Sequence, residues 1–229
     1  MGGVDSVAAG AAGAFGALSR LRGRRVFHPF GVGFRARLAP IGTADTAATV
    51  LDRGGEGLVR LSRAVGLPER LPDPCGLGLR IVDAHGPGFH QDILLVSSGS
   101  APGARHTISP ARGFADRPYS SVLPYRLAGE LVMIGARAAG MSGPGPGLAE
   151  LRRRASAEIE FDLLLATPGG PWRSVGRLEL GDRMPPEETE RLGLDPTNTG
   201  GGLELAGLVN RLRGPSYRGS QRGRAAARV

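Results

Sequence analysis

Short β-prone runs, separated by glycine, proline and aspartate, are the feature that most constrains the fold of this chain. Runs that end at turn-forming residues are typical of strands joined by tight connections. They occur at 26–34, 57–62, 77–82, 92–97, 158–166 and 172–180, with a further extended or mixed segment at 119–140. With many strands and few helices, the pattern predicts a mainly β (α+β) protein, a closed or nearly closed antiparallel barrel with flanking helices.

Helical spacing is confined to a few segments. Residues 1–24 carry apolar side chains at the spacing of a loosely amphipathic helix, and an arginine cluster follows them. We expect this helix to pack on the barrel or to contact a partner, with contact to a membrane surface as an alternative. A helix or long turn is expected at 148–156, the start of a short acidic helix at 185–191, and a helix at 203–213.

The charge comes from a single basic residue type. All 29 basic residues are arginine, against 21 acidic residues, and the net charge is +8. Such a balance favours anionic partners, although in a chain this rich in Gly, Ala and Arg many arginines stand where lysine is usual. Aromatic residues do not alternate with arginine as a platform for nucleic-acid bases requires. A basic module that binds nucleic acid or acidic partners through residues 211–228 stays an alternative without strong support.

The composition also excludes several classes of site. A single cysteine, Cys75, excludes an intramolecular disulfide and a zinc site built from several cysteines. No apolar stretch reaches the roughly 20 residues that a membrane-spanning helix needs. We therefore expect a reducing, cytoplasmic setting. The motifs HExxH, CxxC, GxSxG and GxxxxGK[ST] are absent, which argues against zinc proteases, dithiol redox sites, serine hydrolases and P-loop enzymes.

Two residues near opposite ends of the chain have side chains that could transfer a proton or bind a metal ion. His28 lies in RVFHPFGVGF, and its imidazole can accept a proton near pH 7. Tyr217 follows Arg213 by four residues, which places both on one face of a helix. A guanidinium beside a phenol lowers the phenol's pKa and favours the phenolate, a hard ligand for ferric iron. Taken alone, a histidine on an apolar strand is more often a core residue, and an exposed tyrosine in a basic tail explains Tyr217 equally well.

Several segments, taken in order, resemble one family. They are RVFHPFGVGF from Arg25, VRLS from Val59, PDPCGLGLR from Pro72 with DILL from Asp92, YSSVLPYR from Tyr119, VGRL from Val175, LDPTN from Leu194 with GLE from Gly202, and RGPSY from Arg213 with Arg224 beyond it. Together they resemble the haem catalase superfamily, in particular its small catalase-related members. The resemblance implies a catalase-like haem barrel domain at 25–217, preceded by an extension at 1–24 and followed by a basic tail at 218–229.

The resemblance also implies roles for individual residues. His28 would act as the acid and base on the distal side of a haem b, and Ser62 would orient it. Tyr217 would be the axial ligand of the haem iron, with Arg213 stabilising its phenolate. Three arginines match those that pair with the haem propionates: Arg25, Arg60 and Arg224.

One position departs from the family. Catalases have an asparagine at the end of a DxxxN pattern, where this chain has Val96. Valine cannot donate a hydrogen bond to peroxide, and loss of such a donor typically costs about 10²–10³ in rate. The resemblance therefore predicts a peroxidase that acts on hydrogen peroxide or, through a more open pocket, on organic hydroperoxides. A haem-binding protein without turnover is the alternative, and a homo-oligomer is left open.

Overall fold

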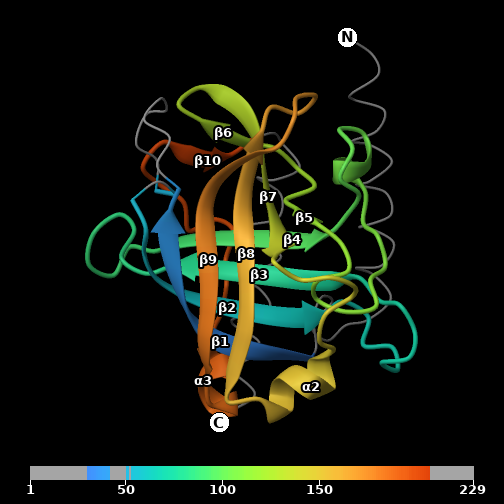
Figure 1. Ribbon diagram of the computed structural model, residues 1–229. Coiled ribbons are helices and arrows are strands. Elements are labelled where there is room, and N and C mark those ends of the chain that lie inside the picture. The colour runs from blue at the N-terminus through green and yellow to red at the C-terminus, as the bar shows by residue number, and fades with distance from the viewer. Residues whose placement is uncertain (1–29, 42–49, 52, 207–229) are drawn as a thin grey trace.

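Eight antiparallel strands close into a barrel in the computed structural model, which describes residues 30–41, 50–51 and 53–206 (Figure 1). The order around the barrel is β7-β5-β4-β3-β2-β1-β9-β8, and pairing of β7 with β8 closes it. The strands are β1 (Phe30–Pro40), β2 (Gly55–Arg63), β3 (Cys75–Ile81), β4 (Gln91–Ser97), β5 (Tyr119–Ser120), β7 (Glu130–Ala139), β8 (Ser156–Ala166) and β9 (Arg173–Arg183). The antiparallel barrel predicted from the sequence is confirmed.

Two further strands and a few short helices lie outside this ring. β6 (Tyr125–Leu127) pairs with β7, and β10 (Leu203–Leu205) pairs with β6, which extends the sheet beyond the barrel. The helices are α2 (Leu148–Arg153), α3 (Pro186–Arg191) and the single 3₁₀ turn η1 (Ala104–His106). None of the helices within the described ranges is long and apolar enough to span a membrane.

Most of the predicted elements are present, with one error. The helix predicted at 203–213 is wrong over its first three residues, which form β10 because their backbone pairs with β6. The rest of that segment lies outside the described residues. The helix predicted at 148–156 ends at Arg153, because strand β8 begins at Ser156. The extension 1–24 and the tail 218–229 lie outside the described residues and stay predictions.

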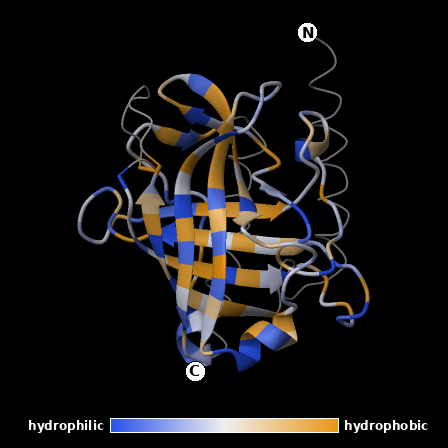
Figure 2. Ribbon diagram, viewed as in Figure 1, coloured by the Kyte–Doolittle hydropathy of each residue, from blue (hydrophilic) through white to orange (hydrophobic). Residues whose placement is uncertain are grey.

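The barrel core is built by side chains that alternate along the strands. Leu61 in β2 lies opposite Val32 in β1 and Leu77 in β3, and Leu77 lies opposite Leu95 in β4. All four side chains are buried in the core. Directly paired residues in antiparallel strands share one face of the sheet, so this row points into the barrel. Figure 2 shows the resulting alternation of apolar and polar residues along the strands. Since only 5% of residues are aromatic, aliphatic side chains supply most of this core.

Polar residues at one end of the barrel are buried together. Asp73 is fully buried, and its carboxylate accepts hydrogen bonds from the backbone N–H groups of Val65, Gly66 and Leu67. The Arg63 guanidinium lies 3.5 Å from the same carboxylate. Cys75 is enclosed beside them, and burial, the largest effect, raises the pKa of its thiol to about 12 despite the nearby Arg63.

The buried thiol gives a direct test of this packing. Because the thiolate is the reactive form, Cys75 in the folded protein should not react with the disulfide reagent dithionitrobenzoate at pH 8. In denaturant the same residue should react at the rate of an ordinary cysteine. Absorbance of the released thionitrobenzoate measures both rates, and rapid reaction of the native protein would contradict the burial of this end of the barrel.

Candidate functional site

A row of small residues runs across the outer face of four neighbouring strands. Ser62 in β2 lies opposite Gly31 in β1 and Gly76 in β3, and Gly76 lies opposite Val96 in β4. The neighbouring residue Leu61 points into the core, so Ser62 and its row face outward. Ser62 is nevertheless buried, and Val96 is partly buried. The fold therefore places the predicted Ser62 and the exceptional Val96 on one face, separated only by a glycine.

A parallel row lies one step along the strands. Here Arg60 lies opposite Gly33 and Gly78, and Gly78 lies opposite Leu94. The Arg60 guanidinium extends toward the first row: its carbon Cζ lies 2.6 Å from the place where a side chain on Gly31 would begin. Only glycine at position 31 allows this approach. Arg60 thus places a cation over Gly31, the residue that lies opposite Ser62 in the sheet.

Other segments cover the second row at both sides. The Thr189 hydroxyl of α3 lies 2.6 Å from the place of a Cβ on Gly33, and the sulfur of Met184 lies 3.0 Å from it. Leu194 occupies the place where a side chain on Gly78 would lie. Gly33 therefore lets α3 pack against the barrel, and Gly78 does the same for the connection after α3. Strand β2, which carries Arg60 and Ser62, lies between the strands of these two glycines.

A buried carboxylate fixes that connection to the barrel. Asp92 is fully buried, and both of its oxygens accept hydrogen bonds from Arg80, at 2.7 and 2.6 Å. Its Oδ2 also accepts from the backbone N–H of Asp195 at 2.8 Å and from Nδ2 of Asn198 at 2.9 Å. Arg80 in turn donates to the carbonyl of Gly193 at 2.9 Å. The first residue of the DILLV segment thus holds the LDPTN segment, about a hundred positions further along the chain, in place.

The histidines of the β3–β4 hairpin form local contacts. Nδ1 of His90 accepts the backbone N–H of Asp83 at 3.0 Å, and Nε2 of His85 lies 3.0 Å from Oε1 of Gln91. In residues 30–41, 50–51 and 53–206, no three His, Cys, Asp or Glu side chains gather closely enough to hold a metal ion.

Only two residues of the predicted site, Arg60 and Ser62, lie within the described ranges. Arg60 and Ser62 lie together on the outer face, as described above. The remaining predicted residues lie outside the described ranges, and their roles stay predictions: Arg25, His28, Arg213, Tyr217 and Arg224. Sequence reasoning missed the glycine rows and the anchoring role of Asp92. The signals for the glycines were the GVG and GLG triplets, whose alternate positions share one face of a strand.

Comparison with known proteins identifies the fold. No family model matches the chain, and no curated protein matches it. Among solved structures it is similar to catalase A from Saccharomyces cerevisiae, with a TM-score of 0.63 and 12% identity. It is similar also to a bacterial catalase, with a TM-score of 0.63 and 15% identity. Each match covers 91% of this chain, but only 63% and 59% of the respective catalases. At this identity the likeness shows a catalase-like fold, in a chain that spans about three-fifths of those proteins.

The Asp92 network predicts a large effect of a single substitution. Asp92→Ala leaves the largely buried Arg80 guanidinium without its carboxylate and should lower the free energy of unfolding by about 3–5 kcal/mol. Glu188→Ala is the matched control, because Glu188 pairs with Arg35 on the surface and should change stability by about 1 kcal/mol or less. Urea denaturation measures both, and equal losses in the two variants would contradict the anchoring role of Asp92.

Proposed function

We propose that this chain is a catalase-related haem protein that reacts with peroxides. The observation that carries the proposal is the joint placement of Ser62, Arg60 and Val96 on one outer face of a catalase-like barrel. Two of the solved structures that resemble it are catalases by name, one from a yeast and one from a bacterium. The family resemblance of the sequence assigns a haem-related role to the same positions.

The residues of this face suit a haem. A flat macrocycle approaches most closely where side chains are absent, as at Gly76 beside Ser62, whereas the Arg60 guanidinium occupies the space over Gly31 on the other side. Haem carboxylates need a cationic fork that can form paired hydrogen bonds, and the Arg60 guanidinium lies beside this surface. Val96 adds an apolar wall at the end of the row. The described residues thus support the proposal by a cation and an apolar side chain on one face.

The family resemblance assigns the proposed roles, and the chemistry of each side chain suits its role. When bound, the haem would supply the iron redox chemistry of peroxide reduction. His28 would accept a proton from one peroxide oxygen and return it to the other, and Ser62 would orient its imidazole. The Tyr217 phenolate would hold the iron, and the positive charge of Arg213 would stabilise that phenolate. Three arginines would hold the propionates: Arg25, Arg60 and Arg224.

Val96 favours a second function of the same site. In a distal pocket, an alkyl side chain cannot donate a hydrogen bond to the charge that develops on peroxide. A haem-binding protein with weak peroxide turnover, or none, is the form of the proposal that this residue supports. The two forms differ in rate and agree on the cofactor and its ligands.

A spectrum and two variants test the cofactor and its ligands. The protein reconstituted with haem should show a Soret band with the features of high-spin ferric iron bound by tyrosinate. Tyr217→Phe should remove the tyrosinate features, while His28→Ala should keep them and lower any peroxide turnover by about 10²–10⁴-fold. A protein that retains no haem, or a Tyr217→Phe variant with an unchanged spectrum, would refute the proposal.

Restoring the missing donor tests the role assigned to Val96. Val96→Asn should raise the rate of hydrogen peroxide decomposition by about 10²-fold, because the amide can donate to the developing charge. Val96→Ala is the control, since it enlarges the pocket without adding a donor. Oxygen evolution measures the rates of the three proteins, and equal rates for the Asn and Ala variants would show that Val96 does not face the substrate.

A further inference from the structure

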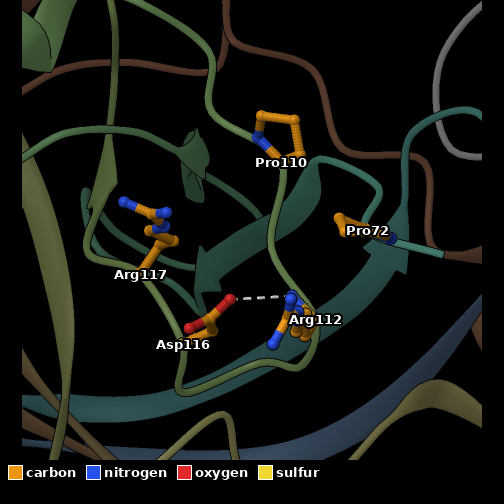
Figure 3. Close-up of a pocket in the computed structure, with 5 residues that line it drawn as sticks. All are labelled: Pro72, Pro110, Arg112, Asp116 and Arg117. Carbon is orange, nitrogen blue, oxygen red and sulfur yellow. Dashed lines mark hydrogen bonds between the residues drawn. The ribbon is translucent and has the colours of Figure 1, made fainter. Parts of the chain in front are cut away.

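A second surface feature lies on the loop that leads into β5. Five residues line a hollow of about 460 Å³: Pro72, Pro110, Arg112, Asp116 and Arg117. Figure 3 shows Arg112 and Arg117 on opposite sides of it, with Asp116 between them and the two prolines beyond. The hollow involves none of the residues assigned to the haem proposal, and it is open to solvent on one side.

The loop that carries these residues is held at several points. The backbones of Ala111 and Asp73 exchange two hydrogen bonds, at 3.0 and 3.2 Å. Phe114 donates its N–H to the carbonyl of Pro146 and accepts the phenol hydroxyl of the buried Tyr119 on its own carbonyl, at 2.9 Å. Such anchoring fixes the backbone around the hollow, so a ligand there would require little ordering of the loop backbone beyond that of the two arginine side chains.

The only acidic residue at the hollow is already engaged. Oδ2 of Asp116 accepts the backbone N–H of Arg112 at 2.8 Å, which closes the turn between them. This bond joins the carboxylate to the backbone of Arg112, and it does not pair the carboxylate with the Arg112 guanidinium. Asp116 therefore stabilises the loop, and the hollow keeps a net positive charge from its two arginines.

Within the described part of the chain, Arg112 and Arg117 lack the carboxylate partners that several arginines of the barrel have. Arg80, Arg154 and Arg177 each pair with a carboxylate. Arg112 and Arg117 are exposed, and within residues 30–41, 50–51 and 53–206 neither guanidinium has a hydrogen-bond or ion-pair partner. Two like charges beside one hollow repel each other, and an anion placed between them would relieve that repulsion.

We propose that this hollow binds a small molecule bearing a phosphate or carboxylate group, held between Arg112 and Arg117. Guanidinium groups match these oxyanions with paired hydrogen bonds. Pro72 and Pro110 offer rigid apolar surfaces for the body of the same molecule. The ligand class is thus an oxyanion attached to a compact apolar group, and the inference does not depend on haem binding.

Titration of the full-length protein with defined probes tests this site. Phenyl phosphate, benzoate and inorganic phosphate are added at low salt while amide chemical shifts are followed. Phenyl phosphate or benzoate should perturb residues 111–117 and bind more tightly than inorganic phosphate, because the ring packs on the prolines. The stronger of the two aryl ligands identifies phosphate or carboxylate as the preferred group.

Charge-matched variants separate a site from general attraction. Arg112→Gln and Arg117→Gln should each weaken binding about threefold to tenfold, with no change in thermal stability. Arg153→Gln removes an equally exposed charge at the end of α2 and should leave binding unchanged. Chemical-shift changes spread over the whole surface, or an equal loss of affinity in all three variants, would indicate non-specific electrostatic attraction and overturn the proposal. Tighter binding of inorganic phosphate than of both aryl ligands would overturn the role of the prolines.

Discussion

The alternation of side chains along the barrel strands is the constraint on which the candidate site depends. Leu61, Leu77 and Leu95 must point inward, because their apolar surface gains free energy only in the core. Their neighbours Ser62 and Val96 must then face outward, whatever else the chain does. A shift of one residue in the register of β2 would move Ser62 into the core and remove the site. The packing of the core therefore determines which strand positions face outward, and so where the site lies on the barrel.

Local pattern made much of the barrel predictable. Strands β2, β3 and β4 coincide closely with the runs at 57–62, 77–82 and 92–97, since alternating apolar residues bounded by turn residues specify both strand and face. β10 was missed because its three residues begin an apolar run with helical spacing, and pairing with the distant β6 decides its conformation. Closure of the ring between β7 and β8 is likewise a long-range pairing that no short window of sequence reveals.

The site was predictable only where a motif carried it. VRLS identified Arg60 and Ser62, and the departure at Val96 was visible from its place after Asp92. The buried network around Asp92 was not predictable, because its partners Asp195 and Asn198 are brought close only by the fold. The approach of Arg60 to Gly31 depends equally on cross-strand register. Motifs thus identified residue types, and the barrel determined which of them meet.

We propose that the outer face beside Ser62 and Arg60 receives a haem, and a crystal structure of the protein loaded with haem is the decisive measurement. We expect a macrocycle against Ser62, Gly76 and Val96, with a propionate on Arg60 and the phenol oxygen of Tyr217 on the iron. A haem bound elsewhere on the surface, or a Tyr217 side chain far from the iron, would contradict the proposal.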